Sequence, residues 1–175
     1  MLISASCPNC SKHFENLEVL KMAAPIVIRN AKLIYKNFAG APDKFNKNGQ
    51  MPNFSVIIPE EDVGYFRDEL KLNVKKRISR DGNEFYYLKI KVGKYAAIYV
   101  RDENGMMNEF QPEMYPELDN MYFTECDISF VTRTWTNGIT TGESVYLSEM
   151  FAKKGDRSSL YREWMTGPED ETLHD

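Results

Sequence analysis

The chain has 175 residues, a length typical of one domain that can bury a hydrophobic core. Hydrophobic residues make up 42% of it and charged residues 27%, as in an ordinary globular protein, and the formal net charge of −4 weighs against a nucleic-acid partner. No apolar run approaches the roughly 18 residues of a membrane helix, and the polar N-terminus lacks the apolar core of a signal peptide. Three cysteines (Cys7, Cys10 and Cys126) are too few for a disulfide scaffold and fit a reducing cytoplasm.

Residues 1–21 have no clean strand or helix period, and we expect them to form an N-terminal extension of the domain that follows. Runs of β-branched and aromatic residues then predict strands within 26–36 and at 54–58, separated by a loop rich in Gly, Pro and Asn. Three acids at 60–62 begin a stretch that predicts a short helix reaching residue 70, because acidic side chains are favoured at a helix N-terminus.

Residues 75–92 predict a β-hairpin, because Asp81-Gly82-Asn83 is a turn sequence between two strand-like runs. Phe54 and Phe85, which lie in or beside apolar runs, are expected in the core. The second strand of the hairpin alternates between apolar and aromatic-basic residues, with Leu88, Ile90 and Val92 on one face and Tyr87, Lys89 and Lys91 on the other.

Residues 102–120 are acidic, contain two prolines and are expected to be irregular, and strands are expected again from 122 to 147 around an Asn137-Gly138 turn. Short strands separated by turns, with one or two short helices, predict a mainly β fold, an OB-fold-like small antiparallel β-barrel. The domain is placed at 22–152, and a C-terminal segment, 153–175, ends in an acidic tail that is expected to be disordered.

The net charge hides an uneven distribution along the chain. Residues 29–101 hold 15 lysines and arginines against 8 acids, a charge of +7, whereas residues 102–175 hold 5 against 16, a charge of −11. Such an asymmetry is typical of a chain with an anion-binding half and an acidic half, although the two halves can also pair with each other across one fold.

Proteins that bind single strands combine a positive groove along the phosphates with aromatic rings on which bases of any sequence stack. Aromatic and basic residues recur together in four segments of this chain, which favours such binding, although strand propensity alone explains any one of them. Trp135 equally fits a packing anchor beside its turn. The candidate stacking residues are Tyr35, Phe38, Tyr87, Tyr95 and Trp135, and the candidate phosphate ligands are Lys36, Lys47, Lys75, Lys76, Arg77, Lys89 and Lys91.

Several runs of the sequence carry a resemblance to a known family: 28–40 (IRNAKLIYKNFAG), 53–58 (NFSVII), 72–75 (LNVK), 86–92 (YYLKIKV) and 127–135 (DISFVTRTW), followed by 138–139 and 146–147. They resemble a bacteriophage single-stranded-DNA-binding protein family of OB-fold type. The likeness covers roughly residues 25–152, leaves out residues 1–21 and is poor at 102–120. It implies a non-catalytic OB-fold without a cofactor that coats single-stranded DNA during phage replication or recombination in the host cytoplasm.

Proteins of this kind commonly end in an acidic tail that recruits replication or recombination enzymes and competes with DNA. The run Gly167–Asp175 resembles such a tail in charge, although it lacks a terminal aromatic residue. The resemblance therefore implies single-stranded DNA and enzymes recruited by the tail as partners, leaves a homo-oligomer open and implies no membrane.

Other chemistry receives less support from the sequence. Cys7, Cys10 and His13 look like half of a zinc site, but structural zinc takes four ligands and Cys126 is far away in the chain, so we predict no metal. No nucleotide-binding, zinc-protease or serine-hydrolase motif is present, and we predict no enzyme. Two alternatives stay open: a phage interaction or anti-defence protein that acts through its acidic half on a host factor, and a Mg²⁺ nuclease built on acids between 102 and 127.

Overall fold

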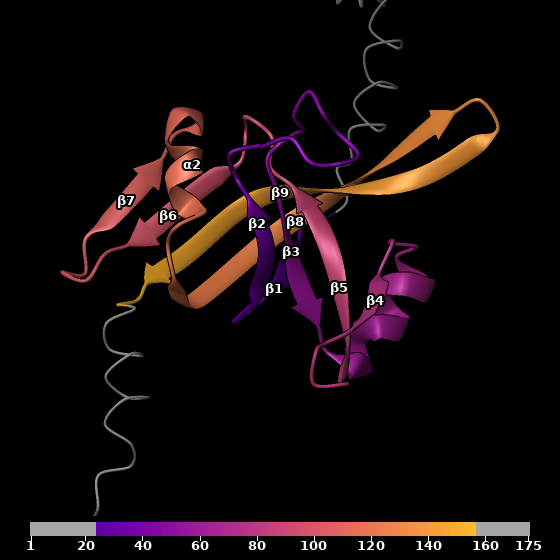
Figure 1. The fold of residues 1–175 in the computed structure, drawn as a ribbon, viewed down its shortest axis with the longest axis horizontal. Coiled ribbons are helices and arrows are strands. Elements are labelled where there is room, and N and C mark those ends of the chain that lie inside the picture. Colours follow the sequence, from indigo (N-terminus) through magenta and orange to yellow (C-terminus); the bar gives the residue numbers. More distant parts are fainter. Residues whose placement is uncertain (1–23, 157–175) are drawn as a thin grey trace, which may run out of the picture.

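Nine strands form one sheet in the computed structural model, which describes residues 24–156 (Figure 1). The predicted extension at 1–21, with Cys7, Cys10 and His13, and the acidic tail at 167–175 lie outside the described residues. The strands are β1 (Ile26–Ile28), β2 (Leu33–Asn37), β3 (Asn53–Ile58), β4 (Lys75–Ile78), β5 (Glu84–Lys91), β6 (Ala97–Arg101), β7 (Met107–Phe110), β8 (Phe123–Asn137) and β9 (Thr140–Lys154).

The main path of the sheet runs β1-β8-β9-β5-β3-β2, so its two ends are strands that follow each other in the chain. Only residues 29–32 separate β1, which pairs with β8, from β2, which pairs with β3. The sheet is therefore a partly open barrel, as OB-folds often are. Its end strands β1 and β2 do not pair with each other, and we call the gap between them, which the connecting residues 29–32 cross, the seam. The predicted mainly β, OB-type fold is confirmed.

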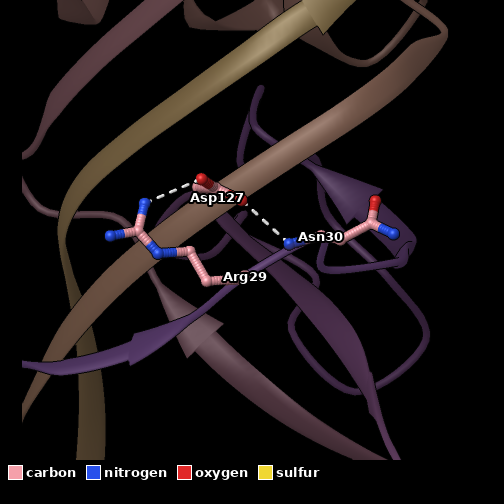
Figure 2. A network of polar contacts seen from close by, with 3 residues as sticks. All are labelled: Arg29, Asn30 and Asp127. Atoms are coloured by element: carbon pink, nitrogen blue, oxygen red, sulfur yellow. Dashed lines mark hydrogen bonds and ion pairs between the residues drawn. The ribbon is translucent and has the colours of Figure 1, made fainter.

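Asp127 on β8 holds the seam together (Figure 2). Its carboxylate accepts hydrogen bonds from the backbone N–H of Asn30 at 2.8 Å and from Nη1 of Arg29 at 2.9 Å. These two bonds, that of Asn30 first, lower the pKa of the Asp127 carboxyl. Asn30 has a left-handed φ of 50°, a conformation that Asn tolerates better than most residues, and there the chain turns away from β8 towards β2.

The inner faces of the strands form one core. Leu88, Ile90 and Val92 are buried as their alternation predicts, and the rings of Phe38 and Phe54 stack with centroids 5.2 Å apart. Cys126 lies in the same core, and burial raises the pKa of its thiol to about 12, so it behaves there as a small apolar side chain.

The predicted helix at 60–70 is present as two short turns, η1 (Glu60–Asp62) and η2 (Tyr65–Glu69). Phe66 of η2 is buried and lies 6.3 Å, between ring centroids, from Phe130 of β8. This helical segment therefore covers one side of the core. No helix among residues 24–156 is long and apolar enough to cross a membrane.

The acidic segment at 102–120 is ordered, and the expectation that it is irregular was wrong. The chain turns at Asp102, whose Oδ1 accepts the backbone N–H groups of Asn104 and Met106, and enters β7, which pairs with β6. β6 in turn pairs in parallel with β9. Two short helical elements follow, η3 (Pro112–Met114) and α2 (Tyr115–Leu118), and both end residues of α2 are buried. Short elements with prolines at their starts carry too little periodicity to be recognised in a sequence.

β8 and β9 form a hairpin of 15 residues a strand, the longest of the described elements, and its tip projects from the rest of the sheet (Figure 1). Trp135 lies on this arm directly opposite Gly142. A Cβ added to Gly142 would lie 2.5 Å from Cζ2 of the indole, so the indole covers the glycine backbone and would have to move to admit a side chain at this position.

Candidate nucleic-acid interface

The outer face of β5 presents the aromatic and basic side chains that its alternation predicts. Tyr87 and Lys91 are half-buried and Lys89 is exposed. Phe85 belongs to the same face and lies 6.0 Å, between ring centroids, from Tyr87, so its predicted place in the core was wrong. Phe85 is an even number of positions from Tyr87 and lies beyond the ladder with β3, which ends at Tyr86.

Tyr35 joins this face because β2 is irregular. The pairing with β3 shifts between Ile34 and Asn37, and Tyr35 has a left-handed φ of 49°. Its ring meets that of Tyr87 edge-on, with centroids 5.4 Å apart, and its hydroxyl accepts a hydrogen bond from Nη1 of Arg77 at 2.9 Å. Backbone strain at a non-glycine residue costs about 1–3 kcal/mol and gathers at functional sites.

The three consecutive cations of β4 divide between two faces. Lys75 lies opposite Tyr87 and Arg77 opposite Phe85, and residues opposite each other in a ladder share a face. Lys76 lies on the other face and pairs with Glu84 at 2.6 Å, and the hydrogen bond to Glu84 raises the pKa of the Lys76 ammonium. Lys75 and Arg77 therefore belong to the face of Tyr87, and Lys76, predicted with them, does not.

The same face continues onto the β8–β9 arm. Nζ of Lys91 donates to Oγ of Ser144 at 3.1 Å, and Lys91 and Arg133 lie 5.6 Å and 5.2 Å from the ring centroid of Tyr146. The sequence reasoning missed Arg133 and Tyr146, although Tyr146 stands between the buried Val145 and Leu147 and alternation places it outward. We name this surface the aromatic-basic face, and it consists of Tyr35, Lys75, Arg77, Phe85, Tyr87, Lys89, Lys91, Arg133, Trp135 and Tyr146.

Three cations of the aromatic-basic face donate hydrogen bonds to neutral side chains. Lys89 donates to the side-chain amide of Gln50 at 3.2 Å, Lys91 to a serine hydroxyl and Arg77 to a tyrosine hydroxyl. Within residues 24–156, no carboxylate lies at ion-pair distance from any basic residue of this face. The positive charge of the face is thus available to an anion, although the whole chain is acidic.

Two predicted residues lie inside the fold. Phe38 is 1% exposed and is a core residue rather than a stacking residue, because the irregularity in β2 reverses the direction of the side chains that follow. Lys36 points away from the aromatic-basic face: its Nζ donates to the carbonyl oxygens of Leu118, at 3.1 Å, and Met121. Lys36 therefore holds the segment around α2 against β2 instead of facing solvent.

The two remaining predicted residues, Lys47 and Tyr95, lie on loops. Lys47 is exposed in the loop between β2 and β3, and Tyr95 is exposed after β5 with Nζ of Lys94 5.0 Å from its ring centroid. Lys94 and Tyr95 line a groove of about 1010 Å³ that also takes in Arg133 and Tyr146. A smaller recess of about 400 Å³ between Lys91 and Trp135 shares Arg133 and Tyr146 with the groove, so the face and the groove are continuous.

The family model of the phage ssDNA-binding domain matches residues 17–154. The chain belongs to this family. The family expected from the sequence is confirmed, and with it the binding of single-stranded DNA. None of the curated proteins that were compared with the chain matches it.

Solved structures of phage single-stranded DNA-binding proteins are similar to the chain at low sequence identity. The single-stranded DNA-binding protein of bacteriophage Enc34 is 10% identical, with a TM-score of 0.50 over 86% of this chain and 87% of that chain. The same Enc34 protein in complex with ssDNA is 13% identical, with a TM-score of 0.47 over 76% of this chain and 88% of that chain. Bacteriophage T7 gp2.5, a single-stranded DNA-binding protein, is 12% identical, with a TM-score of 0.38 over 87% of this chain and 99% of that chain.

Metal chemistry receives no support from the described part of the chain. Between residues 24 and 156, no group of three His, Cys, Asp or Glu side chains is arranged to hold a metal ion. Three acids that the nuclease hypothesis needs, Asp102, Asp119 and Asp127, accept hydrogen bonds from backbone N–H groups.

Proposed function

We propose that single-stranded DNA runs along the aromatic-basic face, from Tyr35 and Tyr87 across β5 to Tyr146 and Arg133 on the β8–β9 arm. One observation carries this proposal: the rings and cations of five strands share one face, and no carboxylate of the described residues lies at ion-pair distance from those cations. Stacking rings beside uncompensated positive charge are what a single strand requires.

The expected binding is largely independent of sequence and involves no catalysis. Every base has a π-face that stacks on Tyr35, Tyr87 or Trp135, while Lys75, Arg77 and Lys89 neutralise phosphates and release counterions. The protein would protect and organise single-stranded DNA during phage replication or recombination in the host cytoplasm. The alternative, a protein that acts on a host factor through its acidic half, has less support because three of its acids bind the protein's own backbone.

Equilibrium titration of a fluorescent oligo-dT with the full chain, at several salt concentrations, tests this proposal. The affinity should fall with salt with a slope of about 0.7 per phosphate contact, and a duplex of the same length should bind more weakly. Absence of binding at low salt, or equal affinity for the duplex, would contradict it.

Replacement of Tyr87 by alanine tests the stacking part separately. Loss of one stacked base costs about 1–3 kcal/mol, so Tyr87→Ala should weaken oligo-dT binding about tenfold and leave the salt slope unchanged. Phe151→Ala is the matched control, because Phe151 is an exposed aromatic residue that is not among the residues of the aromatic-basic face, and its ring stacks on that of Tyr99 with centroids 5.1 Å apart. Equal losses for both variants would show that Tyr87 has no special role.

A further inference from the structure

Most of the β8–β9 arm carries no acid, although the arm belongs to the acidic half of the chain. Residues 128–142 include Arg133 as their one charged side chain, whereas residues 102–175 as a whole hold 16 acids. Glu143, the first acid after this stretch, lies on the other face of the arm from Trp135, where its carboxylate accepts a hydrogen bond from the hydroxyl of Thr134. The arm can therefore approach a polyanion without electrostatic repulsion.

The outer part of the arm has no third strand beside it. β1 pairs with β8 only from Ile128 to Phe130, and β5 meets β9 only at Tyr146. Within residues 24–156, no further strand pairs with the arm between these positions and its tip, which projects from the rest of the sheet (Figure 1). The proposed path of the DNA ends on this arm, so whatever follows along the DNA meets its tip.

Ile139 stands at this tip, in the two-residue turn with Gly138 that joins Asn137 to Thr140. Gly138 has a left-handed φ of 61°, which suits glycine, whereas small polar residues are usual at the neighbouring position of such a turn. The side chain of Ile139 is fully exposed, more so than that of any other large hydrophobic residue in the part of the chain that the structure describes. It adds nothing to the core, so its apolar surface is open to a ligand.

The size and place of this side chain fit the end of a DNA duplex. A single isoleucine is too small for a protein partner, since a stable interface buries about 800 Å² on each side. The last base pair of a duplex presents a flat π-face that no further base covers, and isoleucine is one of the apolar side chains that DNA-binding proteins pack against stacked bases. A single strand that runs past Trp135 towards the tip reaches such a base pair where it enters a duplex.

We propose that the tip of the arm recognises the junction between single-stranded and double-stranded DNA, with Ile139 packed on the terminal base pair. This inference rests on the proposed function, which brings the single strand to Trp135. The arm lies at one end of the proposed path, and a DNA strand has a direction. A duplex therefore fits at one end of the bound strand and not at the other, so the protein binds junctions of one polarity.

Competition against a fluorescent oligo-dT measures junction binding by the full chain. The three competitors are an oligo-dT, the same oligo-dT with a hairpin duplex at its 5′ end, and the same oligo-dT with that hairpin at its 3′ end. One of the two junctions should bind roughly fivefold more tightly than the oligo-dT alone, because part of the apolar surface of Ile139 leaves water. The other junction should stay within about twofold of the oligo-dT, which corrects for any general attraction to the added duplex.

Replacement of Ile139 separates this contact from the rest of the DNA site. Ile139→Ser should abolish the gain for the junction and leave the affinity for oligo-dT within about twofold, whereas Ile139→Leu, which keeps the apolar surface, should retain the gain. Ile78→Ser is the matched control and should also retain it. Ile78 is likewise an exposed isoleucine beside a hairpin turn, but it lies opposite Glu84, on the other face of β4 from Tyr87.

The possible outcomes distinguish this inference from the proposed function. Equal affinities for the three competitors, the same gain at both ends, or a gain that survives Ile139→Ser would overturn the junction contact while the proposed function stands. If oligo-dT does not bind at low salt, the proposed function fails and the junction contact with it.

Discussion

The basic and acidic halves of the chain use their charges in opposite ways. In the first half, Lys75, Arg77 and Lys89 lie on an outer face, where Arg77 and Lys89 donate to neutral side chains. In the second half, Asp119 and Asp127 accept backbone N–H groups and hold neighbouring segments together. The cations remain available to a ligand, whereas these acids are part of the framework. The net charge of −4 therefore says little about the face that we propose as the DNA-binding surface.

Replacement of Asp119 should have the largest effect among the variants that test this difference between the cations and the acids. Its carboxylate accepts the backbone N–H groups of Phe38, at 2.7 Å, and Ala39, at 2.9 Å, and so links the end of α2 to the end of β2. Asp119→Ala leaves two donors without their charged acceptor and should lower the free energy of unfolding by about 2 kcal/mol. Glu117→Ala, which removes an exposed acid two residues away, is the control in urea denaturation. A DNA-binding defect in Asp119→Ala without loss of stability would contradict the structural role.

Arg133 sharpens the comparison because it is a cation of the acidic half that belongs to the aromatic-basic face. Arg133→Ala should weaken oligo-dT binding about threefold to tenfold, since it removes a proposed phosphate ligand and a cation that lies over the ring of Tyr146. Lys153→Ala is the matched variant from the same half, where Nζ of Lys153 pairs with Glu125 at 3.4 Å. It should bind oligo-dT as the unchanged chain does. Equal effects would mean that overall charge, rather than the face, decides affinity.

Lys75 and Lys76 are adjacent in sequence and lie on opposite faces of the hairpin. Lys75→Ala should reduce the salt slope of oligo-dT binding by about 0.7, the value for one phosphate contact on a single strand. Lys76→Ala should leave the slope unchanged, because this ammonium faces Glu84. The measurement is the same salt titration for both variants. A slope that falls equally in both would contradict the division of β4 into two faces.

The smallest effect concerns pH and the seam. Because the pKa of Asp127 is lowered in the folded state, its stabilising contribution is complete above its unfolded pKa of about 3.9 and is lost as pH falls through the lower, folded value. Asp127→Asn should therefore have a lower free energy of unfolding than the unchanged chain at pH 7. The difference should be under about 1 kcal/mol, because the Arg29–Asp127 ion pair is exposed, and it should become smaller near pH 3. Urea midpoints at the two pH values measure it. A gap that widens at low pH would contradict the assignment.

Much of this architecture follows from local patterns. The Asp81-Gly82-Asn83 turn and the alternation of β5 are short-range features, and both predictions hold. The errors lie where one residue changes the alternation: the irregularity in β2 turns Tyr35 outward and Phe38 inward, and no local preference announces it. The roles of Lys36 and Asp119 depend on contacts more than 80 residues apart, which strand patterns cannot reveal.

The seam between β1 and β2 also has a consequence for amide hydrogen exchange. The N–H of Ala31 donates to the carbonyl oxygen of Cys126 at 2.6 Å, and that of Ile57 donates to the carbonyl oxygen of Lys32 at 3.0 Å. These amides span the one place where the main path of the sheet has no ladder. The two protons should therefore exchange by a local opening of the barrel wall, faster than the amides that are bonded within the β3–β5 ladder, whose exchange requires the whole core to unfold. The exchange rates of these two amides therefore report how often the barrel opens at the seam while the rest of the protein stays folded.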